Sequence, residues 1–140
     1  MKIYLASSWR NANQPACLAA LRAAGHEVYD FRHPEPGSEG FSWKQIDPGY
    51  APTPASNPEM VAYQAWNAER FRYALKHPAA QHGFHLDMKA LAECDACVLL
   101  LPCGRSAHLE LGWATGAGKR TIVFIDKYDE PELMYLMCDR

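Results

Sequence analysis

The fold is decided by residues 94–119, which read CDACVLLLPCGRSAHLELGWATGAGK. Ala96–Leu101 is a continuous apolar run, which is typical of a strand buried on both faces of a parallel sheet. Pro102–Arg105 ends this strand, and from Ser106 the apolar residues recur at three- and four-residue steps, which predicts a helix that Gly118 ends. The recurring apolar positions of this helix are Leu109, Trp113, Ala114 and Ala117.

A carboxylate, Glu110, falls in the first turn of the predicted helix. Ligands of open α/β sheets bind just beyond the carboxyl ends of the strands, so we expect Glu110 where a substrate would bind. The positive end of the helix dipole favours the ionised form of a carboxyl group, which suits a nucleophile or a stabiliser of positive charge. The alternative is that Glu110 only makes a favourable charge interaction at the start of its helix.

The composition is that of an ordinary globular domain, with 140 residues, 49% hydrophobic and 21% charged. A formal net charge of -2 gives no electrostatic footprint for a nucleic acid or a membrane surface. The longest apolar run is far too short to span a membrane, and the segment after Met1 is too short for a signal-peptide core. Five cysteines, an odd number, indicate reduced thiols. We therefore expect a soluble cytoplasmic protein with a single domain over residues 1–140.

The first thirty residues predict a right-handed βαβ unit. Lys2–Ala6 is a predicted strand, and a helix that begins near Pro15 buries Leu18 and Leu21 and ends at Gly25. Glu27–Phe31 forms the second predicted strand.

A proline-rich loop follows over residues 32–57. Loops of this length inside compact domains are usually functional lids or binding loops. Phe41, Trp43 and Tyr50 would be unusual in a flexible linker, so we expect some of them, Trp43 first, to line a ligand site. The alternative is that these aromatic side chains simply pack the loop onto the sheet.

Two helices are predicted between this loop and the decisive strand. Asn57 and Pro58 are placed as N-cap and first residue of a helix over Glu59–Lys76. A second helix over Gly83–Glu93 carries Asp87 on its apolar face, where a charge needs a partner or a function. The alternative is that Asp87 caps a helix that begins one turn later. The residues that share this face with Asp87 are Phe84, Met88 and Leu91.

The chain closes with a predicted strand over Thr121–Ile125 and a helix from about Asp129, with Pro131 in its first turn. The whole element order predicts an α/β fold, a flavodoxin-like doubly wound parallel sheet in a three-layer α/β/α sandwich.

The motifs around Glu110 resemble the nucleoside 2-deoxyribosyltransferase family. Members of that family share a helix aspartate, a strand opened by an Asp-Ala or Asp-Val pair, and a Gly/Ser-rich turn into Glu-Leu-Gly or Glu-Ile-Gly. This chain has Asp87, Asp95-Ala96, and the segment from Gly104 through Glu110-Leu-Gly112. By this resemblance Glu110 matches the nucleophile that attacks the anomeric carbon, and Asp87 matches the acid that protonates or positions the leaving base.

The family resemblance also implies a phosphate site. The 5′-monophosphate N-glycosidases of the family bind phosphate through a Tyr-x-x-x-Ser-x-Arg segment and a small polar residue before the catalytic helix. The matching residues here, all candidates for substrate binding, are Tyr4, Ser8, Arg10, Gly104, Arg105 and Ser106. A guanidinium group and helix N-terminal N–H groups are suited to phosphate oxygens. The alternative for Arg10 is a solvated loop charge.

One departure from the family distinguishes its two chemistries. Transferases of the family, which pass deoxyribose to another base, usually carry an aspartate about six residues before the nucleophile, and that position is Gly104 here. The sequence therefore favours hydrolysis of a nucleotide over nucleoside transfer, with a non-catalytic nucleotide-binding module as a third hypothesis. The resemblance implies a small nucleoside or nucleotide substrate, no cofactor, no nucleic-acid polymer or membrane partner, and a homo-oligomer, a dimer or larger.

Other motifs carry less chemistry. Cys94 and Cys97 with His82 and His85 have a spacing from which zinc sites can be built, but Cys97 belongs to a buried strand, so ordinary core thiols and no metal are expected. His108 is expected at the surface or in an interface. Gly116-Ala-Gly118-Lys119 ends a helix and lacks the strand that precedes a phosphate loop.

Overall fold

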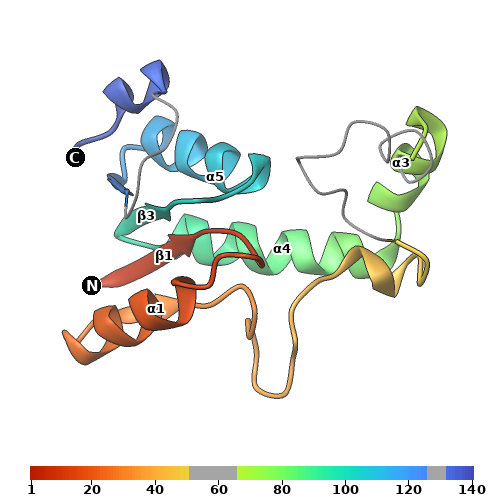
Figure 1. The fold of residues 1–140 in the computed structure, drawn as a ribbon, viewed down its shortest axis with the longest axis horizontal. Coiled ribbons are helices and arrows are strands. Elements are labelled where there is room, and N and C mark those ends of the chain that lie inside the picture. Colours follow the sequence, from red (N-terminus) through yellow and green to blue (C-terminus); the bar gives the residue numbers. More distant parts are fainter. Residues whose placement is uncertain (51–65, 126–131) are drawn as a thin grey trace.

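A four-stranded parallel sheet forms the centre of the molecule in the computed structural model, which describes residues 1–50, 66–125 and 132–140 (Figure 1). The strand order is β2-β1-β3-β4, so the chain runs outward from β1 on both sides, as in flavodoxin-like folds. This confirms the predicted fold class. The strands are β1 (Lys2–Ala6), β2 (Glu27–Tyr29), β3 (Ala96–Leu100) and β4 (Arg120–Phe124).

Helices cover both faces of the sheet because alternate strand residues point to opposite sides. Ile3 and Leu5 of β1 pack with Leu18 of α1 (Gln14–Ala23). Tyr4 and Ala6 face the other way, onto the cluster that α4 (Pro78–Glu93) and α5 (Arg105–Gly116) complete. The remaining described helices are η1 (Trp43–Gln45), α3 (Ala68–Leu75) and η3 (Leu133–Met137).

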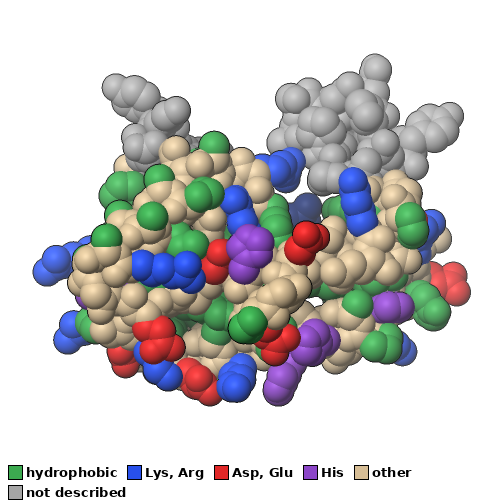
Figure 2. Space-filling view, turned by 90° about the horizontal axis from the view of Figure 1, so that it is seen from below, with side chains coloured by type: hydrophobic (Ala, Val, Ile, Leu, Met, Phe, Trp, Pro, Cys, Tyr) green, Lys and Arg blue, Asp and Glu red, His purple; other side chains and the backbone are tan. Residues whose placement is uncertain are grey.

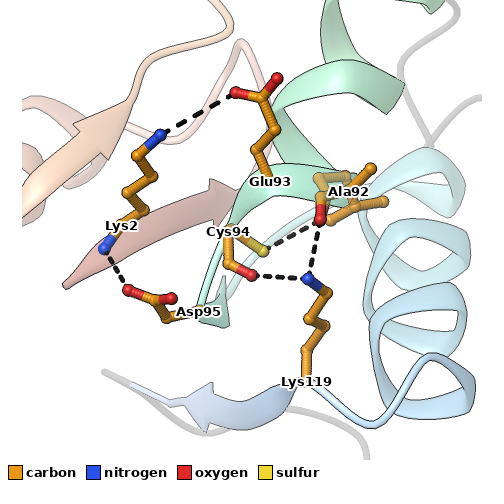
Figure 3. Close-up of polar contacts among 7 residues, drawn as sticks. Lys2, Ala92, Glu93, Cys94, Asp95 and Lys119 are labelled. Atoms are coloured by element: carbon orange, nitrogen blue, oxygen red, sulfur yellow. Dashed lines mark hydrogen bonds and ion pairs between the residues drawn. The ribbon is translucent and has the colours of Figure 1, made fainter.

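The end of α4 is fixed to its neighbours by polar contacts (Figure 3). Lys119 Nζ donates hydrogen bonds to the carbonyl oxygens of Ala92 (2.7 Å) and Cys94 (2.8 Å), where the helix dipole favours a cation. The backbone N–H of Lys2 donates to Asp95 Oδ2 at 2.8 Å. Together these bonds tie the α4–β3 junction to β1 and to the turn before β4, and so fix the position of α4 along the sheet.

Helix α4 begins five residues earlier than predicted, at Pro78. His77 is its N-cap, and its Nδ1 accepts a hydrogen bond from the N–H of Ala79 at 3.2 Å. Asp87 therefore lies in the middle of the helix, and the alternative that Asp87 is a cap is wrong.

The predicted helix over Glu59–Lys76 is also wrong in its extent. Helix α3 begins at Ala68, because the side chain of Asn67 accepts the N–H of Arg70 at 2.8 Å and caps it. The proposed start at Asn57 and Pro58 lies outside the described residues.

The last described segment of the chain also differs from its predicted structure. In place of a closing α-helix, the short 3₁₀ helix η3 begins after Glu132, whose side chain accepts the N–H of Met134. Asp129 and Pro131 lie outside the described residues.

Helix α5 also departs from its predicted pattern. It begins at Arg105, which places Glu110 in the second turn, and Gly118 follows it with φ +70°, as a helix stop requires. Leu109 and Trp113, two of the recurring apolar positions that predicted the helix, are exposed, Leu109 by 75%. The face that packs on the sheet carries Ala107, Leu111 and Ala114, because small side chains allow a close approach of the helix.

The surface mixes charges of both signs. Figure 2 shows acidic, basic and histidine side chains interspersed on the face seen from below. No helix within the described ranges has the length and apolar character needed to cross a bilayer.

Candidate active site

Two carboxyl groups and two tyrosines come together beside the paired strands β1 and β2. Tyr4 and Tyr29 are register partners on adjacent parallel strands, and their rings stack with centroids 5.3 Å apart and planes at 19°. Tyr29 Oη donates a hydrogen bond of 2.8 Å to Asp87 Oδ1 on α4. Glu110 on α5 interacts electrostatically with Asp87 and with both tyrosines. The structure therefore brings together the two acids that the sequence singled out.

Glu110 is protonated more readily than an ordinary glutamate. Burial and, to a smaller extent, the negative charge of Asp87 raise its pKa to about 7, and the O–H group of Tyr4 acts in the opposite direction. The expectation that the helix dipole would keep Glu110 ionised is wrong, because the side chain lies beyond the first turn and burial outweighs the dipole.

Asp87 has the same tendency. Burial raises its pKa, and the hydrogen bond from Tyr29 lowers it in part. Because two like charges close together repel each other, the ionised form of Asp87 opposes the ionisation of Glu110. A pair of carboxyl groups with one proton can act as base or nucleophile and as acid within one reaction.

Tyr4 faces this pair from β1. Its side chain is only 1% exposed, and burial together with the charges of Glu110 and Asp87 raises its pKa, so the hydroxyl keeps its proton. Tyr4 Oη affects Glu110 through its dipole but makes no hydrogen bond of standard geometry to any described residue. The hydroxyl that the sequence assigned to substrate binding therefore lies beside the carboxyl pair.

The loop after β1 carries Ser8 and Arg10, and Asn11 ties it to the loop before α5. The buried amide of Asn11 donates to the carbonyl oxygens of Leu100 (3.3 Å) and Pro102 (3.2 Å). The Ser8 hydroxyl accepts the N–H of Arg10 at 3.2 Å. The two segments that the sequence assigned to phosphate are thus adjacent.

The side chains of these segments are available to a ligand. Arg10, Arg105 and Ser106 are exposed, and within residues 1–50, 66–125 and 132–140 none of the three side chains has a hydrogen bond or ion pair. Gly104 is the N-cap of α5 without a side-chain cap, and a Cβ added there would meet nothing within 4 Å. The N-terminus of α5 therefore faces open space with its N–H groups uncapped.

Trp43 lies in an aromatic cluster beside α3 and α4. Its ring meets Phe41 edge to face at 4.9 Å and Trp66 at 5.3 Å. Phe41 packs directly on Gly83 of α4, one turn before Asp87 on the same helix. The described aromatic residues Phe41 and Trp43 thus pack against α4 and α3, where the alternative had the loop packed onto the sheet, and Phe41 reaches the helix that carries Asp87.

The cysteines and histidines that could have formed a metal site have separate contacts. Cys94 and Cys97 are buried and free, and Cys94 Sγ donates to the carbonyl oxygen of Leu91 at 3.1 Å. His82 Nε2 lies 3.6 Å from Glu35. In the part of the chain that the structure describes, no three His, Cys, Asp or Glu side chains gather closely enough to hold a metal ion.

Two cavities of about 430 and 630 Å³ lie in the described part of the chain and are not lined by the carboxyl pair. Both are lined by Arg22, Asp30 and His33, and Tyr29 lines the smaller one. Glu110 and Asp87 line neither, so the chemistry of the pair, and not the size of a cavity, identifies the candidate site.

Sequence reasoning missed Tyr29. The signal was available, because Lys2-Ile3-Tyr4 and Glu27-Val28-Tyr29 share one pattern, and strands of the same pattern place their tyrosines side by side when they pair in parallel register. His108, expected at the surface or in an interface, is part-buried and bonds Tyr135 Oη at 2.9 Å through Nε2.

No protein-family model matches the chain, and no curated protein matches its sequence. Among solved structures, the chain is similar to a 2-deoxyribosyltransferase from the psychrotolerant bacterium Bacillus psychrosaccharolyticus, with a TM-score of 0.50. The likeness covers 96% of this chain and 79% of that chain at 20% sequence identity. The parallel sheet and its flanking helices therefore form the α/β fold that this 2-deoxyribosyltransferase also has.

Proposed function

We propose that the protein cleaves the N-glycosidic bond of a nucleoside 5′-monophosphate, or of a nucleoside, and releases the free base to water. The observation that carries this proposal is the half-buried carboxyl pair of Glu110 and Asp87, held by different helices beside two tyrosines. Glycosyl transfer uses two such acids, one as nucleophile and one as proton donor. The fold likeness to a 2-deoxyribosyltransferase supports N-glycosidic chemistry.

In the proposed reaction Glu110, whose pKa the charge of Asp87 raises in the free protein, passes its proton to Asp87 as the substrate binds and is then ionised. The bond from C1 of the sugar to the base nitrogen breaks, and its electron pair leaves with the base, which takes the proton of Asp87. Glu110 stabilises the oxocarbenium-like sugar and bonds to C1. Water then attacks C1, displaces Glu110 and returns a proton to Asp87. No step needs a metal or a cofactor.

The proposed phosphate site consists of the two segments joined by Asn11. Arg10, Ser8 and Ser106 hold the 5′-phosphate, with Gly104 and Arg105 at the uncapped start of α5. A guanidinium group and helix N–H groups bind phosphate through charge-assisted hydrogen bonds. This contact orients the sugar over Glu110. Trp43 is the proposed stacking surface for the base.

A second candidate is transfer of deoxyribose to another base with the same nucleophile. The fold likeness favours it, because the similar protein is a 2-deoxyribosyltransferase. Gly104 weighs against it, since the transferases that the sequence resembles usually have an aspartate at this position. The third possibility, a nucleotide-binding module without turnover, leaves the paired acids without a role.

The test is incubation with a panel of nucleosides and 5′-monophosphates, followed by chromatography for free base. We expect the protein to release the base from a monophosphate. Adding a second, free base should not increase the rate of this release. Glu110→Ala should abolish release, while the control Glu69→Gln, in an exposed residue of α3, should leave it unchanged. Arg10→Ala should raise KM for the monophosphate and leave the KM for the nucleoside unchanged.

Each alternative has its own outcome in this panel. Acceleration by the free acceptor base would select the transferase. Thermal stabilisation by a nucleotide with no release of base would select the binding module. Full turnover by Glu110→Ala would remove the proposed nucleophile.

A further inference from the structure

Tyr29 donates a side-chain hydrogen bond to Asp87, one of the two carboxyl groups of the pair. It ends β2, is partly buried, and its hydroxyl donates to Asp87 Oδ1 across 58 positions of sequence at 2.8 Å. Within the described ranges, this is the one hydrogen bond that the Asp87 carboxyl makes. Oδ1 thereby accepts a hydrogen bond, and Oδ2 makes none to a described residue.

The ring of Tyr29 is fixed as firmly as its hydroxyl. It stacks on Tyr4, whose side chain is fully buried in the core cluster of β1, α4 and α5. Two nearly parallel rings at 5.3 Å leave the hydroxyl little freedom to swing away from α4. The strand register sets this arrangement, because Tyr4 and Tyr29 are directly paired in the parallel ladder.

We propose that Tyr29 is a positioning residue, which holds Asp87 through Oδ1 so that Oδ2 delivers its proton to the leaving base. This inference rests on the proposed function for the role of Asp87, and on the structure alone for the pairing of Tyr29 with Asp87. Groups that orient a catalytic side chain from behind are a general requirement, since a small misplacement slows the reaction.

The charges around the pair explain why the partner is a tyrosine. Asp87 on α4 faces Glu110 from α5, Tyr4 from β1 and Tyr29 from β2, and Glu35 from the following loop acts on Tyr29. Burial and these negative charges raise the pKa of Tyr29, so the hydroxyl stays a donor throughout the working pH range. A neutral donor orients Asp87 without the strong stabilisation of the carboxylate that a cation would give, so Asp87 can still hold a proton.

The test is Tyr29→Phe, which keeps the stacked ring and removes the donor. The hydrogen bond lowers the pKa of Asp87, so its loss should raise that pKa, as followed by ¹³C NMR of labelled aspartate carboxyl groups and assigned with Asp87→Asn. With a nucleoside 5′-monophosphate, kcat should fall on the order of tenfold or more, while KM changes by less than about twofold. The matched control is Tyr73→Phe, in a tyrosine that is 72% exposed on α3.

The two readouts separate this inference from the proposed function. An unchanged Asp87 pKa in Tyr29→Phe overturns the pairing, even in an active enzyme. A shifted pKa with an unchanged kcat overturns the positioning role. A shifted pKa in a protein whose wild-type chain releases no base overturns the proposed function and leaves the pairing intact.

If Tyr29→Phe does not fold, the wild-type chain supplies the readout. The ¹³Cζ signal of Tyr29 should shift as Asp87 titrates, because the two groups share a hydrogen bond. A ¹³Cζ chemical shift that stays constant while Asp87 titrates overturns the inference.

Discussion

Glu110 is a side chain whose protonated form the folded protein favours, because its pKa rises from 4.5 to about 7 on folding. Below about pH 4.5 the folded and unfolded chains both hold this proton. Between pH 4.5 and 7 the unfolded chain loses it first, so the folded state loses stability as pH rises through this window. A neutral isostere removes this loss, because Gln keeps the shape of the protonated acid.

Glu110→Gln should therefore stabilise the protein more at pH 8 than at pH 5. The variant's gain in the free energy of unfolding over wild type should be larger at pH 8 than at pH 5 by up to about 3 kcal/mol. This upper bound is the free energy that corresponds to the pKa shift of Glu110. Urea denaturation at both pH values measures it. The control Glu69→Gln should give the same difference from wild type at both values. Parallel curves for Glu110→Gln would show that Glu110 is not held in an environment that opposes its charge.

At the scale of elements, Gly83 on α4 is where the 41–50 segment meets the helix of Asp87. A Cβ at Gly83 would lie 2.7 Å from Phe41 Cβ and 3.1 Å from its Cγ, distances that force the ring to move. Ala stabilises a helix interior by up to about 1 kcal/mol over Gly, whereas overpacking costs about 1–3 kcal/mol. The contact with Phe41 therefore decides whether Ala at position 83 stabilises or destabilises the protein.

Gly83→Ala should lower the free energy of unfolding by up to about 2 kcal/mol, as the difference between these two effects. Gly116→Ala is the matched control, since it lies in helix α5 and its new Cβ would meet nothing within 4 Å. That variant should be as stable as wild type or more so, measured by urea denaturation. Equal changes in the two variants would mean that Phe41 does not pack on α4.

The elements show what local sequence can and cannot predict. The strand over Ala96–Leu100 was predicted almost to the residue, because a continuous apolar run between breakers has few alternatives. The buried face of α5 was not, because Ala107 and Ala114 carry weak apolar signals, while the exposed Leu109 and Trp113 carry strong ones. The choice between two apolar faces is made by packing against the sheet, which no local pattern contains.

Some features of the candidate site could also be predicted from the sequence, and others could not. Asp87 and Glu110 could be singled out because one is a charge on an apolar face and the other follows the decisive strand. Their raised pKa values and the Tyr29 bond could not, because both arise from groups that only the fold brings together. The helix dipole alone does not determine the ionisation of Glu110, because burial of its side chain and the charge of Asp87 on another helix outweigh it.

At the scale of the whole molecule, large apolar side chains remain exposed on two adjoining elements, α5 and η3. Leu109 is 75% exposed and Leu136 is 83% exposed. The segment that carries Leu136 is anchored, since His108 Nε2 bonds Tyr135 Oη at 2.9 Å and the Asp139 carboxylate accepts the N–H of Thr121 at 2.8 Å. Anchored apolar surface of this kind usually marks a protein–protein contact.

We therefore expect the chain to form a dimer or larger homo-oligomer through this surface. Analytical ultracentrifugation should give a mass that is a multiple of the single chain, and Leu136→Glu should shift it toward the monomer, because a charge buried in an apolar contact has no partner. Leu75→Glu on α3, in a residue that is 43% exposed, is the control and should leave the mass unchanged. Circular dichroism verifies that both variants fold. A wild-type chain that sediments as a monomer at tens of micromolar would show that the exposed side chains do not serve self-association.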